Sequence, residues 1–109
     1  MSGFTIYGVR LIDDCEIRYV GFTRFTPQER LRSHIADTTY GTPGRVFRQW
    51  LLLNADKVEA VTICKAETKA DARAMEKGAI GACLQTGQRL FNSDHVPSHL
   101  RVVALSRAA

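Results

Sequence analysis

The sequence has few cysteines and lacks any apolar run long enough to cross a bilayer. Its three cysteines, Cys15, Cys64 and Cys83, are widely spaced, form no CxxC pair and follow no secretory leader, which argues against a disulfide-stabilised secreted domain. We therefore expect a reducing, cytoplasmic setting. The longest apolar run covers residues 50–53, far short of the roughly 20 residues of a membrane-spanning helix, so we expect no membrane segment.

Internal repeats and low-complexity tracts are also absent from the sequence. Its composition, 45% apolar and 24% charged, is average for a globular domain and excludes a fibrous or disordered chain. A chain of 109 residues can bury one hydrophobic core but is too short for two. We therefore expect one domain over residues 1–109, with no separate recognition domain and with residues 94–109 as a C-terminal tail.

The net charge is mildly positive, with 15 basic residues against 11 acidic ones. An excess of +4 is compatible with an anionic partner, but the type of cation is more informative than the total. All seven basic residues before position 49 are arginines. A planar guanidinium group matches phosphate oxygens in pairs, whereas a lysine ammonium acts as a point charge. This part of the chain is therefore suited to a phosphate-bearing partner.

Apolar periodicity and turn signals predict an α+β domain with the element order β-β-α-α-β-α. The expected strands run from Phe4 to Leu11, from Glu16 to Phe22 and from Lys57 to Cys64. The expected helices run from Thr26 to about Asp37, from Thr42 to Asn54 and from Thr68 to about Gly87. A short strand at residues 100–105 is a further option. This order suits a small antiparallel sheet of about three strands flanked by helices.

The first two strands are expected to form a hairpin around a turn at residues 13–14. Side chains alternate across a strand, so Tyr7 and Tyr19 are expected on one face of the sheet. We expect Tyr7 to pair with Tyr19 and Val9 to pair with Ile17, which places the two phenols side by side. Taken singly, tyrosines in a sheet are more often packing residues than reagents.

The first helix begins with a capping box, because Thr26 precedes a proline and is followed three residues later by Glu29. On this helix Arg30 and His34 are four residues apart, so they lie together along one edge of the expected buried stripe. Such a pair can bind an anionic ligand, and it can equally belong to a solvated helix edge.

The third helix contains a carboxylate where an apolar residue is expected. Its apolar face is formed by Ala72, Met75, Ala79, Ile80, Ala82 and Cys83. Glu76 falls inside this face, whereas Arg73 and Lys77 lie elsewhere. A buried carboxylate is costly unless it is paired, protonated or bound to a metal ion. Two ordinary alternatives are a salt bridge to an arginine and a position at the margin of the face that reaches solvent.

Together these residues resemble the GIY-YIG nuclease family. Thr5-Ile6-Tyr7 stands where the family has its GIY motif, and Tyr19-Val20-Gly21 stands where it has YIG. The remaining matches, in the family's order, are Arg30, His34, Glu76 and Asn92. The resemblance covers residues 4–93, and its one clear departure is Thr5 in place of the first glycine.

The resemblance implies a DNA endonuclease that hydrolyses phosphodiester bonds with one divalent metal ion. Glu76 would be the only protein ligand of Mg²⁺ or Mn²⁺, which commonly takes its other ligands from water and substrate oxygens. A single carboxylate argues for a one-metal mechanism instead of a two-metal clamp. Arg30 would hold the scissile phosphate by charge-assisted hydrogen bonds.

The resemblance also assigns the groups around the attacking water. We expect Tyr7 to act as the general base, with its pKa lowered by the metal ion and by Arg30, and Tyr19 to orient the water or the phosphate. Alternatively, His34 is the base and Tyr7 relays the proton. Asn92 would hold the pocket or a phosphate in place, although an asparagine after a helix is also an ordinary turn residue.

The expected partner is DNA, whether single-stranded, duplex or branched. Arg24, Arg45 and the segment 38–44 are candidates for contacts with backbone phosphates. With no separate recognition domain, specificity would come from DNA shape, from dimerisation or from a partner protein.

One alternative function is that of a catalytically inactive GIY-YIG-like domain that binds nucleic acid or a protein. Another is an unrelated α+β module in which Glu76 pairs with Arg30.

Overall fold

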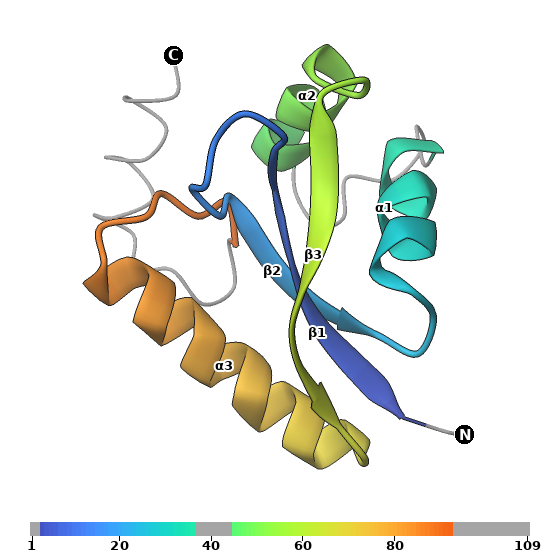
Figure 1. Ribbon diagram of the computed structural model, residues 1–109, viewed down its shortest axis with the longest axis vertical. Helices are drawn as coiled ribbons and strands as arrows, with labels where there is room; N and C mark the ends of the chain where they lie inside the picture. The colour runs from blue at the N-terminus through green and yellow to red at the C-terminus, as the bar shows by residue number, and fades with distance from the viewer. Residues whose placement is uncertain (1–2, 37–44, 93–109) are drawn as a thin grey trace.

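Three antiparallel strands and three helices form the described part of the chain, in the order β-β-α-α-β-α (Figure 1). The computed structural model describes residues 3–36 and 45–92, with the exception of the Arg45 side chain. The expected α+β class, element order and antiparallel sheet are confirmed. The expected start of the second helix at residues 42–43 and the possible strand at residues 100–105 lie outside the described residues.

The strands are β1 (Phe4–Leu11), β2 (Tyr19–Thr23) and β3 (Val58–Ala66), and β1 lies between the other two. Strand β2 begins three residues later than expected. The reason is that the preceding segment bonds to a different part of the chain: the backbone N–H of Ile17 donates to the side chain of Gln88, and the carbonyl of Arg18 accepts from Phe91 N. Residues 16–18 are therefore held by the segment after the last helix.

The hairpin register differs from the expected one by two residues. Tyr7 lies opposite Gly21, and Val9 lies opposite Tyr19. Because the shift is an even number of residues, Tyr7 and Tyr19 still share one side of the sheet. Ile17 was expected on that side as well, but it precedes β2 and packs with Ile6 and Val20 on the opposite face. The two phenols are therefore diagonal neighbours instead of a directly opposed pair.

A β-bulge interrupts the pairing of β1 with β3 next to Tyr7. Ile6 pairs with Cys64, whereas Tyr7 pairs with Thr62, so Ile63 has no partner of its own. The side chain of Ile63 is 39% exposed. Bulges bend a strand and increase its twist, and this one lies at the position where β1 carries the buried phenol.

The helices are α1 (Pro27–Ala36), α2 (Arg45–Leu53) and α3 (Lys69–Gln85). The capping box of α1 is present, because Glu29 N donates to Thr26 Oγ1 and Thr26 N donates to Glu29 Oε1, both at 3.1 Å. Thr68 caps α3 in the same way by accepting from Asp71 N. No helix of the described part is long and apolar enough to span a membrane.

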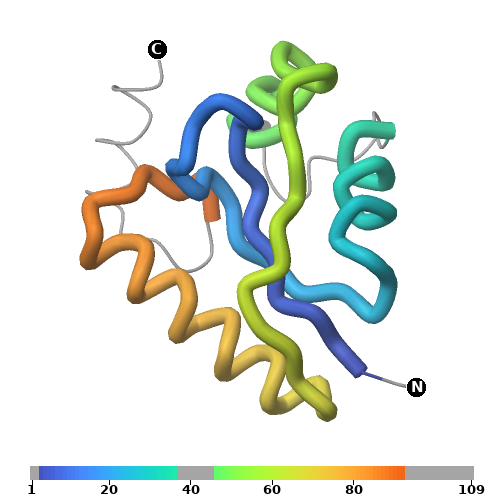
Figure 2. The backbone as a smooth tube through the Cα atoms, in the orientation of Figure 1, coloured from blue at the N-terminus to red at the C-terminus, as the bar shows by residue number. Residues whose placement is uncertain are grey.

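Helix α3 covers one face of the sheet, and α1 and α2 cover the other (Figures 1 and 2). Ile6 and Val20 pack beneath α3, whereas Tyr7 and Val9 pack beneath the other two helices. The buried stripe of α3 is narrower than its sequence suggests. It consists of Ala72, Ile80 and Cys83, while Met75 and Ala82 are exposed. The short antiparallel sheet therefore carries one apolar cluster on each of its faces.

Candidate functional site

A buried hydrogen bond joins the central strand to the first helix. Tyr7 of β1 is 1% exposed, and its Oη lies 3.0 Å from Nε2 of His34 on α1. His34 is itself only 6% exposed, so it lies beneath the helix and not along a solvated edge. The sequence motif thus brings together a phenol and an imidazole that are 27 residues apart.

Gly21 leaves the space that the Tyr7 hydroxyl occupies. A Cβ atom at position 21 would lie 2.7 Å from Tyr7 Oη and 2.9 Å from its Cζ. Both distances are shorter than real Cβ contacts, so a larger residue would displace the phenol. The hydroxyl of Tyr7 therefore reaches across β2, at the edge of the sheet.

Tyr19 forms an aromatic wall beside this pair. Its ring centroid lies 6.4 Å from that of Tyr7 and 5.7 Å from that of His34. On its other side it stacks on Phe47 of α2, with centroids 4.3 Å apart and an interplanar angle of 13°. Stacking of this kind fixes the plane of the Tyr19 ring, so its hydroxyl has a defined direction.

Two charged side chains act on the Tyr7 hydroxyl. Arg30 of α1 is exposed at the surface, and its charge and hydrogen bonding lower the pKa of Tyr7. Glu76 of α3 acts in the opposite direction through its charge. Burial is the largest cause, outweighs the effect of Arg30 and raises the pKa of Tyr7 to about 12. The expected lowering by Arg30 is therefore present, but burial exceeds it.

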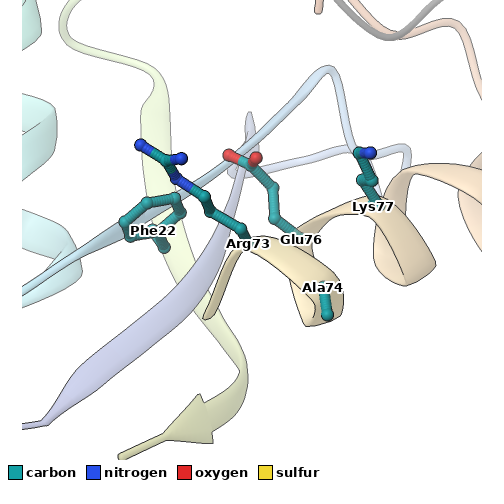
Figure 3. Close-up of a pocket in the computed structure, with 5 residues that line it drawn as sticks. All are labelled: Phe22, Arg73, Ala74, Glu76 and Lys77. Carbon is teal, nitrogen blue, oxygen red and sulfur yellow. The ribbon is translucent and has the colours of Figure 1, made fainter. Parts of the chain in front are cut away.

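Glu76 is half-buried at the border of the apolar stripe of α3. Together with Phe22 of β2 and with Arg73 and Lys77 it lines an open pocket of about 600 Å³. Figure 3 shows its carboxylate extending from α3 between the side chains of these two basic residues. The marginal position agrees with one ordinary alternative for this residue, although its charge also reaches the Tyr7 site.

Glu76 is the one carboxylate among the residues described as lining this pocket, and it would be the ligand of a divalent ion there. Among residues 3–36 and 45–92, no group of three or more His, Cys, Asp and Glu side chains comes together to hold a metal. A carboxylate is a hard oxygen donor, and Mg²⁺ is often bound by one carboxylate plus water and substrate phosphate. Arg73 and Lys77 on the same wall would oppose a bare cation and favour one that arrives with phosphate oxygens.

Asn92 contacts the backbone of β2 and not the Tyr7 hydroxyl. Its Oδ1 accepts from Val20 N at 2.9 Å, and its Nδ2 donates to Val20 O at 2.6 Å. The residue is 5% exposed, so both bonds are shielded from water. Asn92 thereby fixes the strand segment that carries Tyr19 and Gly21, which agrees with the expectation that it holds the pocket in place.

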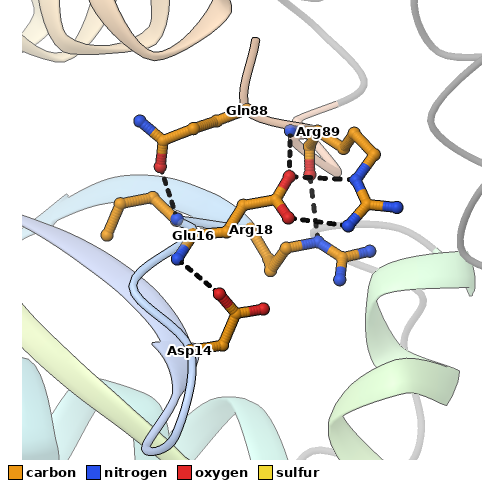
Figure 4. A network of polar contacts seen from close by, with 6 residues as sticks. Asp14, Glu16, Arg18, Gln88 and Arg89 are labelled. Carbon is orange, nitrogen blue, oxygen red and sulfur yellow. Dashed lines mark hydrogen bonds and ion pairs between the residues drawn. The ribbon is translucent and has the colours of Figure 1, made fainter. Parts of the chain in front are cut away.

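A second polar network holds the hairpin, and sequence reasoning did not identify it (Figure 4). Glu16 accepts hydrogen bonds from Arg89 at its backbone N, Nε and Nη2, at 2.7 to 3.0 Å. These bonds lower the pKa of Glu16 to about 2. The guanidinium of Arg18 lies against Phe91 and Trp50, with Cζ 4.7 and 5.3 Å from the ring centroids. Glu16 and Arg89 are 73 residues apart in the chain, so no local signal reveals their contact.

The predicted phosphate contacts are described only in part. Arg24 is exposed, and its Cζ lies 5.6 Å from the centroid of the Phe4 ring. The side chain of Arg45 and the segment 38–44 lie outside the described residues.

The structure therefore brings Tyr7, Tyr19, His34, Arg30 and Glu76 towards one edge of the sheet, with Asn92 behind them. Comparison of the chain with protein-family models, curated proteins and solved structures finds no match in any of the three.

Proposed function

We propose that this domain is a DNA endonuclease that hydrolyses phosphodiester bonds with the help of one divalent metal ion. The observation that carries the proposal is the convergence of a base, a cation and a carboxylate on one phenol. His34 lies 3.0 Å from the Tyr7 hydroxyl, and the charges of Arg30 and Glu76 both act on that hydroxyl. General bases, phosphate ligands and metal ligands are the groups that phosphodiester hydrolysis requires.

In this proposal Tyr7 and His34 act as one proton-transfer unit. A phenol with a pKa of about 12 is a poor base by itself at neutral pH. Tyr7 can, however, take a proton from the attacking water while passing its own proton to Nε2 of His34. The buried imidazole then carries the proton, and the phenol is restored. Of the two arrangements that the sequence left open, the raised pKa of Tyr7 supports the relay.

Arg30 and Glu76 act on the phosphate in this proposal. Arg30 is exposed, so its guanidinium is accessible to a phosphate oxygen at the site. Glu76 would hold Mg²⁺ or Mn²⁺, which when bound stabilises the charge that develops on the phosphate and the leaving oxygen. Tyr19 is placed to orient the water or the phosphate, because its ring is fixed between Phe47 and the Tyr7 pair.

Substitution of the two charged residues tests the proposal. We expect Glu76→Gln and Arg30→Ala each to lower cleavage by about 100-fold or more, the scale of losing one preorganised charge. A plasmid-nicking assay with Mg²⁺ or Mn²⁺ measures the rates, and circular dichroism verifies the fold. Asp13→Ala and Arg32→Ala remove an exposed carboxylate and an exposed guanidinium elsewhere and should leave the rate unchanged. Full activity of Glu76→Gln would end its assignment as a metal ligand.

A second candidate function is binding of nucleic acid without cleavage. It is favoured by the burial of Tyr7, whose 1% exposure leaves the phenol almost inaccessible to water. A salt-sensitive gel shift without any product under Mg²⁺ or Mn²⁺ would support this candidate over the nuclease.

A further inference from the structure

Three pockets adjoin one another at the end of the sheet where β2 leaves it, because neighbouring pockets share lining residues. The middle pocket is lined by Phe4, Phe22, Phe25, Arg24, Arg30 and Lys69, among others, and measures about 290 Å³. It shares Phe22 with the Glu76 pocket, and it shares Phe4 and Arg24 with a third pocket of about 480 Å³. We call this combined surface the basic groove. Arg30 and Glu76 belong to it, so it leads directly to the proposed site.

The charge of the basic groove is strongly asymmetric. Its cationic side chains are Arg24, Arg30, Lys65, Lys69, Arg73 and Lys77. Among the described residues, two carboxylates line the same walls, Glu67 and Glu76. The resulting excess of four positive charges equals the formal excess of the whole chain. The positive charge is thus concentrated in one groove, and this is the electrostatic pattern of a surface that follows a phosphate backbone.

Aromatic rings alternate with these cations. Phe25 is 67% exposed, in the turn between β2 and α1, and its backbone N donates to Thr23 Oγ1 at 3.0 Å. Phe4 and Phe22 meet edge to face, with ring centroids 5.8 Å apart. Arg24 lies over the Phe4 ring. Phe25 thus presents an exposed ring beside Phe4 and Phe22, in the same pocket as the cations.

An unpaired nucleotide offers both of the required groups, whereas a duplex offers only one. Phosphates are accessible in either form, but the faces of the bases are hidden in the stack of a duplex. Proteins that bind single strands combine a cationic groove with aromatic rings on which the bases stack. An acidic peptide would satisfy the cations but would leave Phe25 without a flat apolar partner.

We propose that the basic groove binds single-stranded DNA, with a base stacked on Phe25 and the adjacent phosphates on Arg24 and Lys69. The assignment rests on the proposed function and names its substrate: a strand that is unpaired beside the phosphate to be cut. Arg30 lines both the groove and the Tyr7 site, so a strand bound on Phe25 places a nearby phosphate within reach of Arg30.

Binding measured without cleavage tests this proposal separately from the nuclease. Fluorescence anisotropy with labelled oligo(dT) and with a duplex of the same length is carried out in EDTA on the full chain. Phe25→Ala should weaken binding of oligo(dT) by about tenfold, because one stacked base contributes about 1–3 kcal/mol. Phe25→Tyr keeps a stacking ring and should retain the affinity. Leu53→Ala removes an 81% exposed apolar side chain from α2, outside the groove, and should change nothing.

Three results would overturn the proposal. They are an unchanged or equally reduced affinity for single strand and duplex in Phe25→Ala, tighter binding of oligo(U) than of oligo(dT), and full competition by poly-glutamate. A charge-only surface predicts the first and third, and an RNA-binding groove predicts the second. If the chain binds oligo(dT) tightly but cleaves no substrate, the binding proposal is supported and the nuclease proposal is wrong. If it cleaves duplexes and Phe25→Ala does not change the rate, the nuclease proposal is supported and the binding proposal is wrong.

Discussion

The two ends of strand β2 differ in how their polar groups are used. At the start of the strand, Val20 forms two buried hydrogen bonds with the side chain of Asn92. The contacts between Glu16 and Arg89 hold the residues that precede the strand. From the middle of the strand onward, Gly21 gives space to the Tyr7 hydroxyl, and Phe25 lies exposed in the turn that follows. Polar groups are paired with one another at the first end. At the second end cations and a ring remain accessible for a ligand.

The difference indicates that, within a few residues, one set of polar groups stabilises the fold and another is available for chemistry. Buried polar groups that are fully paired make a unique and rigid arrangement, and they hold the strand from one side. The cations and the ring beyond the strand can then stay exposed without loss of the fold. We therefore expect substitutions of Asn92 and Glu16 to change mainly stability, and substitutions of Tyr7 and Phe25 to change mainly activity or binding.

The largest expected effect is that of Tyr7→Phe, at the reactive end. The ring still fills the core, but the hydroxyl next to His34 is lost, so we expect cleavage to fall by about 100-fold or more. Plasmid nicking gives the rate, and thermal unfolding verifies the fold. If Tyr7 and His34 act as one unit, Tyr7→Phe combined with His34→Gln should cost no more than either substitution alone. Full activity of Tyr7→Phe would remove the phenol from the mechanism.

The next effect concerns the other end of the strand. Asn92→Ala leaves Val20 N and O buried without partners, so we expect a loss of about 3 kcal/mol in the free energy of unfolding. Urea denaturation measures this loss. Asn54→Ala removes a side chain that donates to Trp50 O at a half-buried position, and it should cost about 1 kcal/mol or less. Equal losses in the two variants would show that Asn92 has no special part in holding β2.

The smallest effect is the pH dependence of the Glu16 network. The pKa of Glu16 is lowered from 4.5 to about 2, so its pairing with Arg89 stabilises the fold above pH 4.5 and is lost as the pH falls through 2. Partial exposure screens the pair, so we expect the contribution to be roughly 1–2 kcal/mol. Glu16→Gln should therefore be less stable than the unchanged chain at neutral pH and equally stable near pH 2. A constant difference across this range would contradict the assignment.

Local signals in the sequence predicted the elements well because each depends on neighbouring residues. The capping box of Thr26 and Glu29 and the cap at Thr68 involve contacts three residues apart, and both helices begin where expected. The strand faces followed from simple alternation. The hairpin register was wrong by two residues, because residues 16–18 bond to the segment after α3, which no local pattern records.

The sequence predicted which residues belong to the site, but it did not predict how deeply each of them is buried. The motif indicated that Tyr7, His34 and Arg30 belong together, and the structure places them around one hydroxyl. Their order in the chain does not reveal how deeply each is buried. Burial raises the pKa of Tyr7, whereas the charge of Arg30 alone would lower it, and the motif contains no information on burial. Phe25 was not identified, since one aromatic residue in a turn carries no signal until its exposure is known.

The Asn92 clamp also affects how copies of this chain can meet. Strand β2 lies at the edge of the sheet, where free N–H and C=O groups would otherwise invite a strand from another molecule. The side chain of Asn92 occupies both groups of Val20, and Phe91 N occupies the carbonyl of Arg18. This stretch of the edge is thus already saturated from within the chain. Crowded copies are thereby kept from joining into an extended intermolecular sheet along it.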